Sequence, residues 1–225
     1  MGQSKRPAQG IPAQETLAVG LLLSMVGGFL ESYTYLLHGG VFANAQTGNL
    51  VLMALSLAAG NVRQALFYPT PILAFVLGIL ISTHMCRKYS ARQLLAWEPI
   101  LMGIEIALLF VLGLLPRWVP SSVTTVTVSF LCSMQYNTFR KVGGAPYATT
   151  FCTNNLRQAA QGIYTWVCER DRAAAVRSGR YLLVILAFAA GAFFGALLIG
   201  VFSLRAVWAC CMLLAAVLVL LLWRR

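Results

Sequence analysis

The chain has 225 residues, of which 59% are hydrophobic and only 10% charged, with a mean hydropathy of +0.76. A soluble domain has nearer a quarter of its residues charged, so the composition excludes an ordinary soluble protein and indicates an all-helical integral membrane protein. The net charge of +11 is compatible with a protein that binds nucleic acid. However, the basic residues lie between apolar runs, so positive cytoplasmic loops explain them better and we expect no nucleic-acid partner.

The first half of the chain begins with a polar segment. Residues 1–14 are predicted to form a disordered cytoplasmic tail, and residues 15–225 a single membrane domain in the lipid bilayer. The first predicted span covers 16–38, followed by a glycine-rich polar loop at 39–48. The apolar helix at 49–60 covers only about 18 Å, against a hydrocarbon core of about 30 Å, so it is too short to cross. Further spans are predicted at 68–86 and 98–115.

The second half has a similar order of elements. A span is predicted at 120–139, and a second Gly-Gly loop at 143–153 follows it. The next helix, 155–168, has an apolar face but is too polar to span. Residues 169–180 are predicted to be a charged connector, before the last two spans at 181–202 and 206–223.

Matching polar positions indicate an internal repeat. The segment GGFLESYTYLLHGG at 27–40 aligns with SFLCSMQYNTFRKVGG at 129–144, so that Glu31 falls on Gln135 and Gly39-Gly40 on Gly143-Gly144. The repeats cover about 15–116 and 117–225, and each has three spans plus one short non-spanning helix. Because three is odd, the two repeats are predicted to lie in opposite orientations in the membrane.

The basic residues favour this topology of six transmembrane helices. With three spans per half, Arg63, Arg117 and Arg205 are the only basic residues in the outer connections, of 17 Lys and Arg in the chain. Four spans per half would instead translocate Arg87 and Lys88. The positive-inside bias therefore predicts a multi-pass protein with both termini in the cytoplasm. Inverted repeats with interrupted helices are typical of secondary transporters, whose sites lie where the repeats meet.

Glu31 lies near the middle of the first span, where a charge costs roughly 2.5–3.5 kcal/mol on insertion scales. It shares a helical face with Thr34, Tyr35 and His38. Such a carboxyl group can bind a cationic or hydroxylated ligand or carry a proton. Alternatively, it is protonated and only ties two helices together. Glu105 is the other acid well inside a span, and for it the two interpretations are balanced.

The polar loops supply the remaining candidates for a substrate pathway. Thr47 or Asn49 is expected to be the N-cap of the first short helix, whose free N–H groups would suit an anion, a carbonyl or a phosphate. Alternatively, these residues serve only capping and turn chemistry. The complete candidate set is Glu31, Tyr35, Asn44, Gln46, Thr47, Asn49, Gln135, Asn137, Thr149, Thr150, Thr153 and Asn155.

Other reactive residue types show no pattern of a catalytic or metal site. The six cysteines form no C-x-x-C pair, so they are expected to be buried small hydrophobes. His38 and His84 lie near span ends without a second ligand at metal spacing, so interfacial histidines are expected. We therefore expect no enzyme, cofactor or metal. Close-packing positions between helices are predicted at Gly78, Gly191, Gly195 and Gly200.

Two motifs resemble the YoaK-like family of bacterial membrane proteins, which has no assigned function. They are GGFLESYTYLLHGGVFANAQTGNL at 27–50 and MQYNTFRKVGGAPYATTFCTNNLR at 134–157. The resemblance covers nearly the whole chain after residue 14 and implies a six-span protein of the bacterial inner membrane. Members of the family often have Asp where Glu31 stands here, and Gly where Asn154 stands.

The favoured function is a small permease or secondary transporter of a small polar molecule, proton-coupled through Glu31. Its rival is a non-transporting membrane protein, an assembly partner or sensor, in which the polar loops are structural. An intramembrane enzyme is a weaker third choice, because Glu31 has no partnered nucleophile or metal site. A homodimer is compatible with a bundle of this size.

Overall fold

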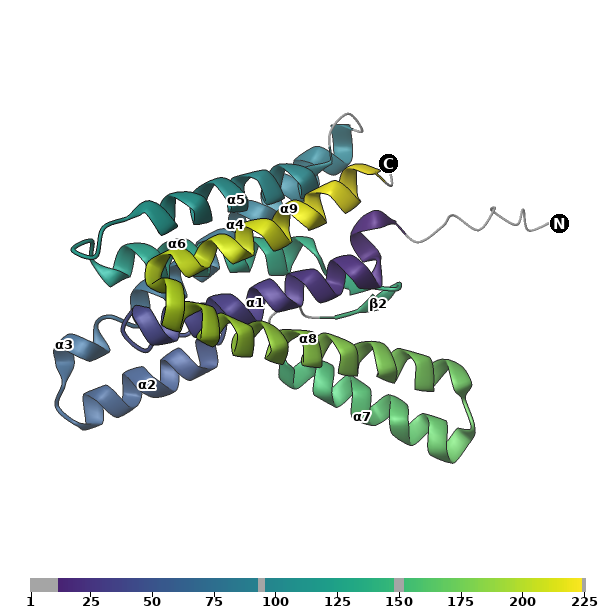
Figure 1. The fold of residues 1–225 in the computed structure, drawn as a ribbon. Helices are drawn as coiled ribbons and strands as arrows, with labels where there is room; N and C mark the ends of the chain where they lie inside the picture. The colour runs from purple at the N-terminus through teal and green to yellow at the C-terminus, as the bar shows by residue number, and fades with distance from the viewer. Residues whose placement is uncertain (1–11, 93–95, 148–151, 224–225) are drawn as a thin grey trace.

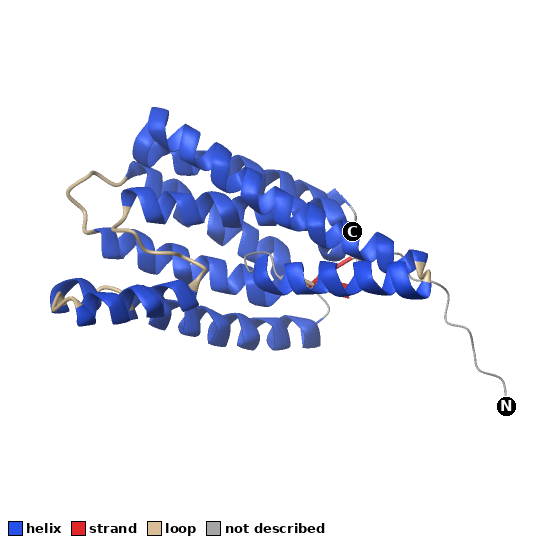
Figure 2. Ribbon diagram, turned by 90° about the horizontal axis from the view of Figure 1, so that it is seen from below, coloured by secondary structure: helices blue, strands red, loops and turns tan. Residues whose placement is uncertain are grey.

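The computed structural model describes residues 12–92, 96–147 and 152–223, and it is helical almost throughout (Figure 2). The long helices run alternately in the two directions of one bundle, so that the start of α1 and the end of α9 lie at the same end (Figure 1). These helices are α1 (Leu17–Leu37), α4 (Pro69–Arg92), α5 (Trp97–Leu114), α6 (Ser121–Thr138), α8 (Arg172–Phe202) and α9 (Trp208–Trp223). The all-helical prediction is confirmed.

Two further helices begin near the middle of the bundle and run towards its opposite ends (Figure 1). They are α2 (Gln46–Ala58) and α7 (Cys152–Glu169). The remaining elements are short and join the helices. They are the 3-10 helix η1 (Ala13–Glu15), α3 (Val62–Ala65), the antiparallel strands β1 (Lys141–Val142) and β2 (Ala145–Pro146), and the 3-10 helix η2 (Ser203–Val207).

The structure differs from the predictions in several connections. The charged connector is mostly helix, because Asp171 accepts a hydrogen bond from the N–H of Ala173 (2.8 Å) and so caps the start of α8. The strand pair was not predicted. Residues 13–14 of the predicted tail belong to η1, and the adjacent Glu15 carbonyl accepts the N–H of Gly143 (2.6 Å). Residues 1–11 lie outside the described ranges.

Within the described ranges, four helical stretches are long and apolar enough to cross a membrane: Leu17–Leu37, Val62–Tyr89, Trp97–Leu114 and Arg172–Trp223. The last has 52 residues, too many for one crossing, and it contains α8 and α9, which run in opposite directions (Figure 1). Helix α6 is not among them because Ser, Thr, Asn and Gln lower its hydropathy. These helices establish a membrane protein.

Glycines allow the closest contacts between helices. Gly28 of α1 lies against the carbonyl of Phe188 in α8, and Gly191 of α8 lies against the carbonyl of Met25 in α1. Gly78 of α4 meets the carbonyl of Phe130 in α6 in the same way. The predicted close packing at Gly78, Gly191 and Gly195 is confirmed. The prediction for Gly200 is wrong, because nothing lies within 4 Å of a Cβ built there.

Candidate functional site

The carboxyl group of Glu31 holds the chain just before α2. Its Oε1 accepts hydrogen bonds from the N–H groups of Asn44 (3.2 Å) and Ala45 (2.9 Å). Ala45 is the N-cap of α2 and has no side chain that could cap the helix. The predicted N-caps, Thr47 and Asn49, lie inside α2, so this prediction is wrong. The buried Glu31 supplies the capping oxygen instead, from another helix.

Asn49 clamps the polar loop onto the first turn of α2. Its Oδ1 accepts the N–H of Phe42 (3.0 Å), and its Nδ2 donates to the carbonyl of Phe42 (2.7 Å) and to Oε1 of Gln46 (2.9 Å). Gln46 in turn donates to the carbonyl of Ala43 (2.9 Å). These side chains therefore fix the backbone of the loop.

Replacing Asn49 with alanine should destabilise the protein by about 1–2 kcal/mol, because it leaves the partly buried backbone N–H and carbonyl of Phe42 without partners. The thermal unfolding midpoint in detergent measures the loss. Asn154→Ala is the matched control, since that side chain is exposed and accepts a hydrogen bond from Arg157 (3.3 Å). Equal midpoints for the two variants would contradict the clamp.

Helix α6 provides several of the polar contacts between the two halves. Gln135 donates to the carbonyl of Leu23 in α1 (3.3 Å). Asn137 donates to the hydroxyls of Ser82 (2.8 Å) and Thr83 (2.9 Å) in α4. Both side chains are buried, so the polar residues of α6 hold it between α1 and α4.

Three buried acceptor oxygens have no hydrogen-bond partner among the described residues. They are Oε2 of Glu31, Oδ1 of Asn44 and Oε1 of Glu105. A protonated carboxyl group is a donor as well as an acceptor, so protons on the two glutamates would supply the donors that this part of the core lacks.

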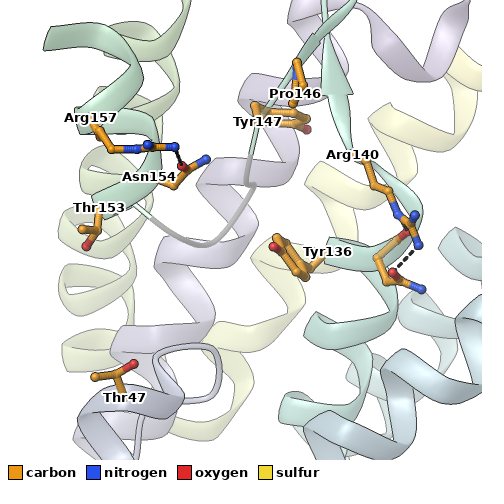
Figure 3. Close-up of a pocket in the computed structure, with 9 residues that line it drawn as sticks. Thr47, Tyr136, Arg140, Pro146, Tyr147, Thr153, Asn154 and Arg157 are labelled. Carbon is orange, nitrogen blue, oxygen red and sulfur yellow. Dashed lines mark hydrogen bonds between the residues drawn. The ribbon is translucent and has the colours of Figure 1, made fainter. Parts of the chain in front are cut away.

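A cavity of about 1030 Å³ opens where α2 and α7 begin. Thr47 lies in the first turn of α2, and Thr153 and Asn154 lie in the first turn of α7. Figure 3 shows these side chains on one side of the space and Tyr136 and Arg140 across it. The lining residues are Thr47, Tyr136, Asn137, Arg140, Pro146, Tyr147, Thr153, Asn154 and Arg157.

Two arginines are among the described residues that line the cavity. Arg140 donates to the carbonyl and the side-chain oxygen of Asn137, and Arg157 donates to Asn154. No acidic residue is among its described lining residues. Burial raises the pKa of the Tyr147 phenol, so this group stays neutral at physiological pH.

The structure brings together only part of the predicted pathway. Thr47, Asn137 and Thr153 line the cavity. Tyr35 is 47% exposed and stacks on Phe42. The residues with hydrogen bonds outside the cavity lining are Glu31, Asn44, Gln46, Asn49 and Gln135. Asn155 is buried and is not among the lining residues. Thr149 and Thr150 lie outside the described residues.

Six lining residues were not among the predicted candidates: Tyr136, Arg140, Pro146, Tyr147, Asn154 and Arg157. Arg140 and Arg157 flank the second Gly-Gly loop, and that placement was the signal in the sequence that pointed to them. Within the described residues, no group of three or more His, Cys, Asp or Glu could hold a metal ion.

Comparisons with known proteins agree with the membrane fold. A family model described as "Protein of unknown function (DUF1275)" matches residues 19–220. The chain is similar to the UPF0700 transmembrane protein YoaK of Bacillus subtilis (strain 168), with 26% identity over 146 residues. That match covers 63% of this chain and 64% of the relative, less than two thirds of its length. No solved structure matches.

Proposed function

The chain belongs to the DUF1275 family, and from its fold and cavity we propose that it is a small permease, or secondary transporter, of a small polar molecule. The observation that carries this proposal is the cavity of about 1030 Å³ at the starts of α2 and α7, two helices that run to opposite ends of the bundle. Interrupted helices whose ends meet inside the membrane form the binding sites of many secondary transporters.

We infer that the chain has six spans in two inverted repeats, with both termini in the cytoplasm of a bacterium. Reciprocal packing supports this arrangement: α1 of the first half packs on α8 of the second, and α6 of the second half packs on α4 of the first. Gly191 and Gly78 occupy the same place in these two contacts. The helices also alternate in direction (Figure 1).

Proton coupling through Glu31 follows from how α2 is held. The carboxylate oxygen accepts two N–H groups just before α2, and Thr47 in the first turn of α2 lines the cavity. A proton on Glu31 weakens this attachment, because charge-assisted hydrogen bonds are roughly twice as strong as neutral ones. We infer that protonation loosens the attachment of α2 and so changes the cavity that Thr47 lines.

The test is a flux measurement. Small polar metabolites that raise the thermal midpoint of the purified protein identify ligands, since a ligand of the folded state stabilises it by mass action. Radiolabelled ligands are then followed into proteoliposomes. Asn154→Trp should reduce uptake, because the larger indole narrows the cavity where α7 begins.

Gln161→Trp is the matched control for this experiment. It places the same side chain on the exposed face of α7, outside the cavity lining, and should keep uptake near the original rate. Unchanged uptake in Asn154→Trp would count against a pathway through this cavity. Absence of uptake for every stabilising compound would count against transport itself.

The alternative function is a non-transporting membrane protein, an assembly partner or sensor. The observation that favours it is that Gln46 and Asn49 use their side-chain amides to fix the loop backbone. Ligand binding without flux across proteoliposomes would support this alternative.

A further inference from the structure

The hairpin formed by the end of α7 and the start of α8 extends beyond the apolar part of α8. The last charged residue of α8 is Arg180, and the uncharged run from Tyr181 onward is the part of this helix that suits the hydrocarbon core. Gly162 of α7 lies against Ser178 of α8, so the residues of α7 that follow it lie beside the charged part of α8. We call residues 163–180 the hairpin tip, and Figure 1 shows that it lies apart from the other helices.

The hairpin tip exposes large apolar side chains. Ile163, Tyr164 and Val167 share one face of α7, because Val167 follows the other two by four and three residues. The exposed fractions of Tyr164 and Val167 are 67% and 61%. Val176 of α8 is exposed as well. Exposed apolar groups that gather outside the hydrocarbon core mark a surface that binds a membrane interface or another molecule.

The charge of the hairpin tip favours one kind of partner for this surface. Four arginines and two acids leave the tip with a net charge of +2. Arg177 pairs with Asp171 (3.3 Å), whereas Arg170 and Arg172 are exposed and have no ion pair within the described ranges. Guanidinium groups match the geometry of phosphate, and apolar side chains beside them can enter a lipid interface. This combination favours a surface of anionic phospholipids.

The depth of the hairpin tip agrees with this partner. The headgroup layer is roughly 5–7 Å thick on each side of the hydrocarbon core. Arg172 begins eight residues before Arg180, which corresponds to about 12 Å along α8. It therefore lies within the Debye length of about 8 Å from the headgroups. Tyr164 and Trp166 are of the two residue types that are enriched at membrane–water interfaces.

A second copy of the chain suits this face less well. In a twofold contact the same surface of each copy meets the other, so the exposed Arg170 and Arg172 of both copies would come together. Like charges placed against each other are unfavourable in an interface. A lipid surface with negative charge has no such conflict.

We propose that the hairpin tip binds the anionic phospholipid headgroups of the membrane surface. Arg170 and Arg172 contact the lipid phosphates, and Tyr164 and Val167 enter the interface beside them. The proposal does not depend on transport, because it concerns the attachment of the hairpin to lipid alone. Its test therefore separates it from the flux experiment.

Cys168 provides a reporter inside the hairpin tip, because it is the exposed one among the six cysteines of the chain. The full chain is labelled there with a nitroxide, and peptide mass spectrometry verifies the labelled residue. It is then placed in nanodiscs of phosphatidylcholine, or of phosphatidylcholine and phosphatidylglycerol in equal amounts. Collisions of the nitroxide with a neutral, water-soluble nickel chelate are measured by electron paramagnetic resonance.

The collision rate should be lower by about twofold or more in the anionic nanodiscs, because the negative surface draws the hairpin tip into the headgroup layer. Sodium chloride at about 1 M should abolish this difference, since it shortens the Debye length to about 3 Å.

Two double variants sharpen this test. Arg170→Gln with Arg172→Gln should remove most of the difference between the two lipids, because each arginine near an anionic surface contributes about fivefold to binding. Arg87→Gln with Lys88→Gln is the matched control. It removes two exposed positive charges from α4 at the same end of the bundle, outside the hairpin tip, and should leave the difference unchanged.

Several results would overturn the proposal. They are equal collision rates in the two kinds of nanodisc, or an equal loss of the difference in both double variants. Dipolar broadening between two nitroxides would indicate a second copy on this face instead. An equal fall of the collision rate when sodium phosphate is added to phosphatidylcholine nanodiscs would indicate a soluble anion. If the arginine double variant does not fold, the comparison of the two lipids with the unmodified protein still decides.

Discussion

Replacing Gly191 with leucine should prevent α8 from packing on α1 and should leave little folded protein. A Cβ at this position overlaps the main-chain atoms of Met25, and main-chain atoms cannot rotate away as a side chain can. Overpacking a core typically costs about 1–3 kcal/mol of stability and occasionally more. Because two helix backbones must separate here, we expect a cost at the upper end of this range. The elution profile in detergent and the thermal midpoint measure the loss.

The same helix supplies the control for this substitution. Gly200→Leu adds the same side chain where nothing lies within 4 Å of the new Cβ, so it should fold normally. Gly28→Leu alters the other side of the contact, at the carbonyl of Phe188, and should be as harmful as the change at Gly191. A folded Gly191→Leu protein with an unchanged midpoint would contradict the close contact of α1 with α8.

Glu31→Ala should destabilise the protein by about 2–4 kcal/mol, because the N–H groups of Asn44 and Ala45 lose their acceptor inside the bundle. Glu31→Gln should be much milder, since the amide oxygen accepts the same two hydrogen bonds. Thermal midpoints of the two variants measure this difference. If the site transports as proposed, Glu31→Gln also loses the response of uptake to a pH gradient, because an amide does not titrate.

Glu105→Gln is the control for the proton response. Glu105 is 2% exposed in α5 and lies outside the lining of the cavity, so its amide should leave the response of uptake to a pH gradient intact. If uptake in Glu31→Gln still responds to a pH gradient, Glu31 is not the group that couples uptake to protons. Equal thermal midpoints for Glu31→Ala and Glu31→Gln would show that the hydrogen bonds to Glu31 do not stabilise the start of α2.

The sequence was sufficient to predict the helices and their close contacts. Long apolar runs predicted the helices, because a chain in lipid must satisfy its backbone groups internally. Three of the four predicted packing glycines lie at contacts between helices. Gly200 does not, because the sequence contains no information on which face of α8 meets a neighbour. The cap of Asp171, which starts α8 early, was present in the sequence but was counted as part of a connector.

The candidate site was less predictable, because it is formed by residues far apart in the chain. Polar residues in the loops were interpreted as pathway residues, but Asn49 and Gln46 form local hydrogen bonds to the backbone instead. His38 was expected to be an interfacial histidine. Its burial beside Arg117 follows from how the ends of α1 and α5 meet the start of α6, which only the fold determines.

The length of α8 has a consequence for the shape that the protein presents to its surroundings. With 31 residues, α8 is about 46 Å long, roughly 16 Å more than the hydrocarbon thickness of a bilayer. The surplus is the arginine-rich beginning of the helix, which lies beside α7 in Figure 1. A bilayer that covers the apolar part of α8 would leave this helical hairpin in the aqueous phase. The tight turn at Arg170, with its positive φ of 59°, is where an epitope tag can be inserted without entering the bundle.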